Sequence, residues 1–326
     1  MLVFVIRRLL ISIPVLIAST ILTFLIVKAT GDPLTYLKTR QANISPEAKQ
    51  RFIDQEAHRL WLDRSWPAQY WHWISNVVMH NNWGQQVQGN DNVRTDVFTA
   101  LGVTARLVAF AIVIALVLAI VTGVVSAVKQ YSITDYTTTF AGFLFLSMPV
   151  FWFAILLKEF FAIKFNSWTG TQTFYTLNQP TSWVNPGQLL GRVLLPTIVL
   201  GLASYAAWSR FTRASMLEVL NSDYIRLARS KGLAPRTVLV KHALRTALIP
   251  LTTVTALDTA ALLSGAIITE NVFQWRGMGY LFLTSLQNRD FNVMLGWLLV
   301  TATFVIVFNL LADILYGFLD PRIRHA

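Results

Sequence analysis

The amino-acid sequence predicts an all-α, polytopic membrane protein with six transmembrane helices. Of its 326 residues, 54% are hydrophobic and only 13% are charged, whereas about 25% of the residues in a soluble domain carry charge. Apolar blocks recur at the length of ~20 residues that a helix needs to cross a bilayer. Their apolar residues are continuous and do not alternate as in a membrane barrel. The six blocks are approximately Leu9–Val27, Leu101–Val128, Thr137–Phe161, Val193–Trp208, Ile249–Ile268 and Val293–Tyr316.

The first block follows Arg7 and Arg8, as the apolar core of a secretory signal peptide would. Its apolar run exceeds the roughly 7–15 residues of such a core, and no small-x-small cleavage site follows, so we expect a retained span. The fourth block is shorter than the others and contains Ser204 and Tyr205. The predicted topology nevertheless includes it as a span.

Basic residues predict the orientation of the helices. An even number of spans places both chain ends on one side, and that side holds about half of the 27 Lys and Arg residues with few acidic ones. Because cytoplasmic loops are enriched in Lys and Arg, we expect both termini and segment 210–249 to lie in the cytoplasm. Segment 31–100 would then lie on the outer side of the cell (cytoplasmic or inner) membrane. The basic residues on the predicted cytoplasmic side are Arg7, Arg8, Lys129, Arg210, Arg213, Arg226, Arg229, Lys231, Arg236, Lys241, Arg245, Arg322 and Arg324.

The formal net charge of +11 could suggest nucleic acid as a partner. The same cytoplasmic bias accounts for that charge, so the expected partner is the lipid bilayer and not nucleic acid. No repeat, low-complexity stretch or second soluble domain interrupts the chain. We therefore expect one transmembrane domain over residues 1–326.

The predicted outer loop, residues 31–100, is rich in tryptophan and begins a helix at Ser45-Pro46-Glu47. One interpretation is a set of amphipathic helices lying at the membrane surface with their indoles at headgroup level. The alternative is a platform or lid that meets an extracytoplasmic partner or substrate. The tryptophans are Trp61, Trp66, Trp71, Trp73 and Trp83.

Catalytic and cofactor motifs are not found in the sequence. It has no cysteine, no G-x-x-x-x-G-K-[ST] phosphate loop, no H-E-x-x-H and no G-x-S-x-G, and its five histidines lack ligand spacing. We therefore expect no catalytic residue, no bound metal and no cofactor in this chain. Asp258 is the one acidic residue deep within a predicted span, among several threonines. It could line a substrate pathway, or it could accept hydrogen bonds from neighbouring helices.

Segment 210–250 has the clearest local pattern. Asn221, Ser222 and Asp223 are residue types that accept bonds from free N–H groups at a helix start. Gly232 predicts a left-handed stop, and Pro235 suits the first turn of a second helix. That second helix should end or kink at Pro250. The sequence thus predicts a basic helix, a sharp elbow and a second helix between two spans.

The residue order of the first helix predicts a docking surface. Ile225, Leu227 and Ala228 offer a small apolar face, which Arg226, Arg229 and Lys231 surround with positive charge. Such a knob suits a groove with an acidic rim on a soluble partner. Weaker candidates for the same contact are Arg210, Arg213 and His242.

This segment resembles the "EAA" cytoplasmic loop of ABC-importer permeases, and within them the B-type permeases of the peptide/nickel branch. The resemblance extends over almost the whole chain, and Arg226 stands where the loop has its namesake glutamate. Arg276 stands where family members tend to have proline. The segments that carry the resemblance are Arg7-Arg8-Leu9, Gly31-Asp32-Pro33, Leu62-Asp63-Arg64-Ser65, Trp83-Gly84, Asp223–Leu233, Lys241–Pro250, Glu270–Phe273, Gly277–Gly279, Arg289-Asp290 and Asp320–Arg324.

The resemblance implies a type I ABC-importer permease that works by alternating access. Its implied partners are a second, homologous permease, two cytoplasmic ABC ATPase subunits that bind ATP and Mg²⁺, and an extracytoplasmic peptide-binding protein. Its cargo would be dipeptides or oligopeptides. The implied ATPase-coupling residues are Tyr224, Ile225, Arg226, Leu227, Ala228, Arg229, Lys231, Gly232 and Leu233.

Three alternatives remain open from the sequence. The same machinery could import nickel, glutathione or another small solute. An ATP-independent channel or secondary transporter would need no ATPase. An intramembrane enzyme would need a polar site, and Asp258 with its threonines is the one cluster that could form it. Neither of the last two explains the residue order of segment 210–250.

Overall fold

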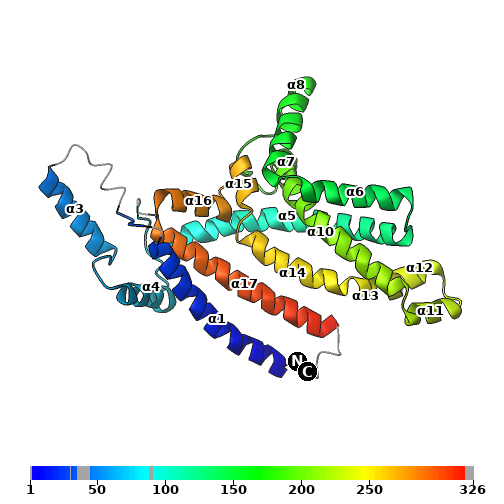
Figure 1. Cartoon of the computed structure of the whole chain (residues 1–326). Coiled ribbons are helices and arrows are strands. Elements are labelled where there is room, and N and C mark those ends of the chain that lie inside the picture. Colours follow the sequence, from blue (N-terminus) through cyan, green and yellow to red (C-terminus); the bar gives the residue numbers. More distant parts are fainter. Residues whose placement is uncertain (1, 30, 35–44, 88–90, 320–326) are drawn as a thin grey trace.

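The computed structural model describes residues 2–29, 31–34, 45–87 and 91–319, and their regular structure is helical (Figure 1). Within these ranges, the β-type pairing consists of a single bridge between Gln85 and Asn92. The C-terminal match Asp320–Arg324, with the predicted cytoplasmic Arg322 and Arg324, lies outside the described residues. The predicted all-α class is confirmed.

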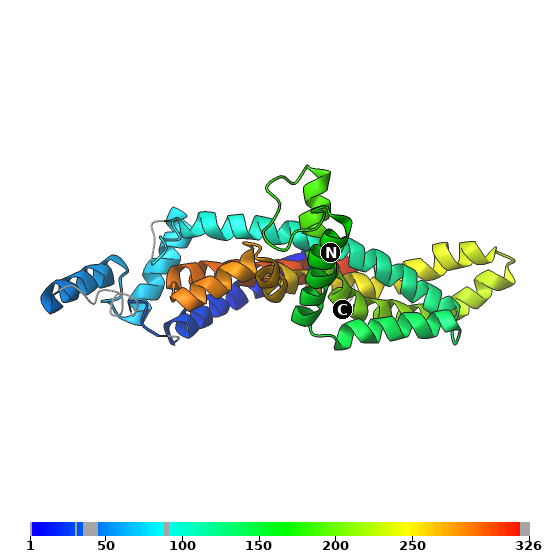
Figure 2. The same ribbon diagram turned by 90° about the horizontal axis from the view of Figure 1, so that it is seen from above.

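Long helices run side by side along the molecule, as Figures 1 and 2 both show. Four helical stretches are long and apolar enough to cross a membrane, and two bent helix pairs raise the total to six if each pair is one span. The four stretches are Val5–Ala29, Val93–Val128, Pro186–Leu220 and Phe291–Leu315. The long helices are α1 (Leu2–Ala29), α5 (Val93–Val128), α10 (Leu194–Leu220), α14 (Ile249–Leu263) and α17 (Phe291–Leu319).

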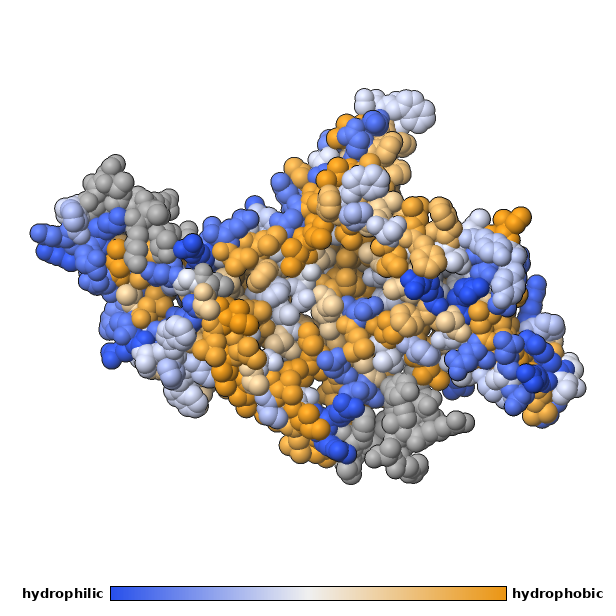
Figure 3. All heavy atoms as spheres, viewed as in Figure 1, coloured by the Kyte–Doolittle hydropathy of each residue, from blue (hydrophilic) through white to orange (hydrophobic). Residues whose placement is uncertain are grey.

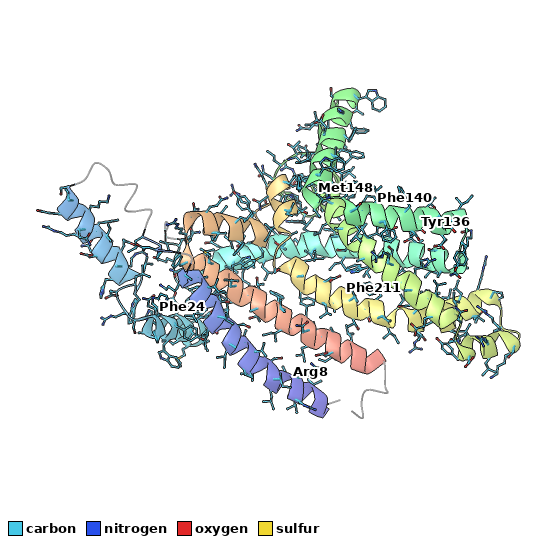
Figure 4. The ribbon with its side chains drawn as sticks, in the orientation of Figure 1. Arg8, Phe24, Tyr136, Phe140, Met148 and Phe211 are labelled. Atoms are coloured by element: carbon cyan, nitrogen blue, oxygen red, sulfur yellow. The ribbon has the colours of Figure 1, made fainter. Side chains whose placement is uncertain are left out.

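The third apolar block is not one continuous helix, which corrects the sequence prediction. It is divided into α6 (Ile133–Ser147) and α7 (Val150–Leu157), and the bent pair turns by 103°. Pro149 lacks an amide hydrogen and forces the residue before it into extended backbone, which Met148 adopts at φ −81° and ψ 124°. Met148 therefore lies at the corner from which α7 rises across the other helices (Figure 4).

The chain bends as expected where it enters the fifth block. The helical stretches Pro235–Ala247 and Ile249–Leu263 meet at 43°, and Pro250 occupies the first turn of the second. The prediction that Pro250 ends or kinks the helix is confirmed. Before the bend lie α12 (Pro235–Thr237), the π-helical η3 (Val238–Leu244) and α13 (Arg245–Ala247).

Several shorter helices lie at the two ends of the bundle, while the arm that ends in α8 rises from its middle (Figure 1). Hydrophilic side chains gather at the two ends, on either side of a more hydrophobic middle (Figure 3). Ser45 begins α3 as expected, since its hydroxyl accepts a bond from the Ala48 amide. The remaining elements are α3 (Pro46–Arg59), α4 (Trp66–His80), π-helical η1 (Lys158–Phe165), α8 (Asn166–Thr169), α9 (Pro186–Gln188), π-helical η2 (Leu189–Val193), α11 (Asp223–Ser230), α15 (Ile267–Phe273) and α16 (Met278–Asn288).

Small residues allow α5 and α10 to pack closely along much of their length. Buried small residues recur at every fourth position of α5, so they form one stripe facing α10. A Cβ atom added at Gly123 would lie 2.7 Å from Thr212 Cβ and 2.9 Å from the Ser209 carbonyl oxygen. Such stripes are how membrane helices gain van der Waals contact where lipid is as apolar as the side chains. The stripe consists of Ala111, Ala115, Ala119, Gly123 and Ala127.

The first and last spans are joined at both ends. Arg8 Nη1 lies 3.1 Å from Asp313 Oδ2, while at the other end of α1 Phe24, labelled in Figure 4, packs in one cluster with Phe291 and Leu295 of α17. Asp313 is therefore one half of an ion pair between two helices. Both side chains of this ion pair are partly exposed, so the pair adds little to stability. Its main effect is to fix the register of α1 against α17.

We expect Gly123→Ala to destabilise the protein by about 1–3 kcal/mol, because the added methyl group overlaps the backbone of α10. Gly102→Ala is the matched control on the same helix, since nothing lies within 4 Å of the added atom. The thermal unfolding midpoints of the two variants in detergent provide the measurement. Equal midpoints would show that the helices separate easily at this stripe.

Candidate functional site

The helix of the predicted docking surface forms at the expected place but begins differently from expectation. Helix α11 starts at Asp223 with Ser222 as its N-cap residue, and this residue makes no side-chain capping bond. The Ser222 hydroxyl instead donates to the Val219 carbonyl at 2.5 Å, at the end of α10. The side chain thus fastens the turn to α10 and leaves the first amides of α11 to other partners.

The elbow after α11 has the predicted geometry. Gly232 has φ +75°, and its amide donates to the Arg229 carbonyl at 3.0 Å. Nothing lies within 4 Å of a Cβ atom added at Gly232. Its requirement for glycine is therefore conformational, because side-chain-bearing residues adopt this left-handed backbone only at a cost. Pro235 begins the next helix, as expected.

The residues predicted to couple to an ATPase divide into a buried pair and an exposed set. Ile225 is 0% exposed and Ala228 is 8% exposed; both pack in one cluster with Met216 of α10 and Val238 of η3. A direct docking contact by this pair, as the sequence predicted, does not fit the structure, because the chain's own apolar side chains cover them. They fix α11 on α10. The exposed members are Tyr224, Arg226, Leu227, Arg229, Lys231, Gly232 and Leu233.

The exposed members present apolar area and positive charge together. Leu227 is 56% exposed and Tyr224 is 44% exposed. Arg226 lies 3.5 Å from Asp223, but both side chains are largely in solvent, so this contact is worth little. The outer face of α11 is therefore a solvent-exposed apolar surface with cations on and beside it.

A buried ion pair supports this end of the molecule. Arg213 of α10 contacts Asp135 of α6 through two parallel bonds, Nη2 to Oδ2 at 2.8 Å and Nε to Oδ1 at 2.9 Å. Ser126 of α5 hydrogen-bonds to the same carboxylate, so three helices meet there. Arg213, expected as a weak docking candidate, is occupied by this pair. Sequence reasoning missed it because the partners lie 78 positions apart.

Asp258 accepts a hydrogen bond from a neighbouring helix. Its Oδ2 atom lies 2.7 Å from Nε1 of Trp208, a fully buried residue of α10. Of the two sequence interpretations, the structure provides this one directly. The bond joins α14 to α10, the helix on which α11 is fixed.

A second buried carboxylate organises the opposite end of the bundle. Glu270 of α15 is 0% exposed and accepts bonds from Thr104 of α5 at 2.7 Å and from the amides of Gly279 and Tyr280 at 2.8 and 3.1 Å. Burial raises the pKa of the Glu270 carboxyl above its ordinary value, although these donors oppose the shift. Glycine at 277 leaves room for the carboxylate, since an added Cβ would lie 2.5 Å from it.

Sequence reasoning noted Glu270 and the glycines after it only as part of a family pattern. Their physical role is to close α15 and α16 into a hairpin against α5. Lys158 of η1 adds to this, because its ammonium donates to the Val272 carbonyl at the end of α15 at 2.8 Å. No signal in a single sequence connects positions 166 residues apart, such as Thr104 and Glu270.

Comparison with known proteins defines the class. The chain belongs to the family of binding-protein-dependent transport system inner membrane components, whose model matches residues 119–325. The model for the N-terminal part of such membrane components matches residues 1–95. The chain is therefore a multi-pass inner membrane protein, and the family expected from the resemblance is confirmed.

Individual relatives match over almost the full length. The oligopeptide transport system permease protein AppB of Bacillus subtilis is 36% identical, over 99% of each chain. The dipeptide transport system permease protein DppB of Escherichia coli K12 is 37% identical, over 100% of this chain and 99% of the relative. The oligopeptide transport system permease protein OppB of Mycobacterium bovis is 36% identical, over 98% of each.

A solved structure supports the same fold. A chain of the MetNI methionine ABC transporter, in inward-facing conformations, aligns with a TM-score of 0.51 and 16% sequence identity. The alignment covers 69% of this chain and 96% of that one. At this identity the likeness establishes the ABC-importer permease fold alone.

We expect Asp135→Asn to lower the free energy of unfolding by about 2–3 kcal/mol, because it leaves the Arg213 charge without its carboxylate. The expected loss lies below that of a fully buried pair, since the Arg213 side chain is 29% exposed. Asp223→Asn is the control, because that side chain is 98% exposed. Denaturant titration in detergent measures both variants, and an equal effect on the two would contradict the role of the ion pair.

The buried Glu270 carboxyl should make stability depend on pH. Because its folded pKa is raised above the ordinary value of 4.5, the folded state binds more protons than the unfolded state between these two values. This contribution to stability is present below pH 4.5 and is lost as pH rises through the folded pKa. Unfolding midpoints measured from pH 4 to 7 (about the range in which carboxylates and their shifted forms titrate) should show this slope in the parent protein.

Glu270→Gln should remove this part of the pH dependence. Glu218→Gln, on the exposed face of α10, should leave it unchanged. A Glu270→Gln variant with the slope of the parent protein would contradict the assignment.

Proposed function

We propose that this chain is the permease component of a dipeptide or oligopeptide ABC transport system, and that α11 couples it to the partner ATPases. ATP hydrolysis belongs to those partner subunits, as in binding-protein-dependent transport generally. The observation that carries the coupling assignment is the exposed apolar and cationic face of α11 on a helix fixed to α10. Peptide cargo is supported by full-length relatives that are named dipeptide and oligopeptide permeases.

The complete importer contains a second, homologous permease, two ATPase subunits below the membrane and a peptide-binding protein outside it. The termini and segment 210–249 lie in the cytoplasm, and segment 31–100 lies outside. The clustering of Lys and Arg in the predicted cytoplasmic segments supports this orientation. Nickel, glutathione or another small solute is the alternative cargo for the same machinery. A channel or secondary transporter that works without ATP would leave the outer face of α11 without a function.

The coupling helix works as a rigid lever. An ATPase groove that grips Tyr224, Leu227 and the surrounding cations moves α11, and the buried Ile225 and Ala228 transmit that movement to α10. Asp258 then carries it to α14 through the bond to Trp208. Each ATPase closure thereby biases the whole bundle toward one of two packed states, which is how alternating access follows from a local contact.

We expect Leu227→Glu to uncouple ATP hydrolysis from peptide uptake, because the exposed leucine lies where the ATPase groove would close over it. The rate of peptide uptake should fall about tenfold or more, as binding does when an anchor residue of a protein–protein interface is replaced. Gly232→Pro should act in the same direction, because proline cannot adopt φ +75°.

Val184→Glu is the control, since this residue is 87% exposed and precedes α9, at the end of the Pro186–Leu220 stretch that is far from α11. Uptake and ATPase activity are measured in proteoliposomes that contain all partner subunits. Unchanged uptake in Leu227→Glu, with the protein present at normal levels, would refute the lever assignment. Uptake in vesicles without ATP would instead support the channel or secondary transporter.

A further inference from the structure

A cavity of about 260 Å³ lies where the outer-loop segment meets the ends of two spans. It is lined by the turn after α3, one face of α4, residues 82–87, the last turn of α1 and the first turn of α17. None of the coupling residues lines it. Because α1 ends at Ala29 and α17 begins at Phe291, the cavity lies level with the ends of both spans, where the membrane meets water. Its volume is near the lower end for small-molecule pockets.

Aromatic rings form much of the wall. Trp61 has the left-handed φ of 58° and stacks on His72, with ring centroids 3.7 Å apart and the planes 10° from parallel. A tryptophan rarely adopts this backbone, so the stack and the turn around it hold the indole in place. The other rings that line the cavity are Phe24, Trp73, Trp83 and Phe291.

One buried side-chain amide in this wall has hydrogen bonds to its nitrogen but, among the described residues, none to its oxygen. Gln69, which is 7% exposed, donates through Nε2 to the carbonyls of Leu62 and Arg64 at 3.3 and 2.7 Å. Its Oε1 atom is buried and has no hydrogen-bond partner among the described residues. The nitrogen is committed to the turn, so the amide cannot rotate to hide its oxygen. Buried acceptors without partners are rare and indicate a missing donor.

Positive charge lines the cavity as well. The Lys28 ammonium lies 5.6 Å from the ring centroids of both Phe24 and Phe291, which hold it over their faces. Asp32 attracts the same ammonium without lining the cavity. Lys28 can therefore offer hydrogen bonds to an anionic group within the cavity, while Gln69 Oε1 can accept one from an N–H group.

From these groups we infer that the cavity binds a small zwitterion, with its anionic group at Lys28 and its ammonium or N–H group at Gln69 Oε1. The indole rings add attraction for the ammonium. Two molecules carry this chemistry: the headgroup of phosphatidylethanolamine, which the membrane supplies at this depth, and a free dipeptide. The site is separate from the coupling face, so the inference does not depend on the proposed function.

Ligand chemistry tests the inference without altering the protein. The complete importer is placed in nanodiscs, and the lipids that it retains are identified by native mass spectrometry. Phosphatidylethanolamine should be retained about tenfold more than phosphatidylcholine, whose trimethylammonium has no N–H to donate. In discs of phosphatidylglycerol and without a binding protein, dialanine should bind by calorimetry, and dialanine amide, which lacks the carboxylate, should bind about tenfold more weakly.

Variants locate the site. Lys28→Met should weaken the preferred ligand about tenfold, and Lys28→Arg should restore it. Lys129→Met is the matched control, because it removes the same charge at the far end of α5. Retention of phosphatidylethanolamine or binding of dialanine that falls in Lys28→Met but not in Lys129→Met supports the inference and identifies the source. Absence of both preferences in the parent protein, or ligand binding that Lys28→Met leaves unchanged, would overturn it. Peptide uptake is not a readout, so these outcomes are independent of the test of α11.

Discussion

The packing of α5 against α10 through small residues is the constraint on which the rest of the structure depends. With glycine at 123 and alanines on the same stripe, the two backbones approach closely enough for Thr212 and Ser209 to fill the gap. In a lipid environment this contact has no hydrophobic driving force of its own, so its stability comes from fit. The positions of Arg213 and Trp208 on α10 follow from it, and through them those of α6 and α14.

Two buried carboxylates secure the ends of this packed core. Asp135 joins three helices near segment 210–249, and Glu270 closes a hairpin at the opposite end. Each is surrounded by donors, which is what a carboxylate taken out of water requires.

Residue types and their local order predict much of this architecture. Continuous apolar blocks revealed the helices, while Gly232, Pro235 and Pro250 marked an elbow and a bend that the structure contains. Prediction failed where tertiary contacts decide. Ile225 and Ala228 have the character of docking residues, but a cluster supplied by α10 and η3 buries them. Pro149 was overlooked as a breaker because hydrophobicity continues unbroken on both sides of it. The hydrogen bonding of the Gln69 amide depends on a turn that no sequence pattern specifies.

The corner at Met148 affects which apolar surface the folded chain presents. Because α7 leaves the direction of α6, large apolar side chains such as Phe140 and Phe151 remain on the outside of the folded chain, 69% and 52% exposed. In a bilayer, rings at such positions contact lipid tails or a neighbouring helix, so the turn at Met148 determines part of the apolar outline of the subunit.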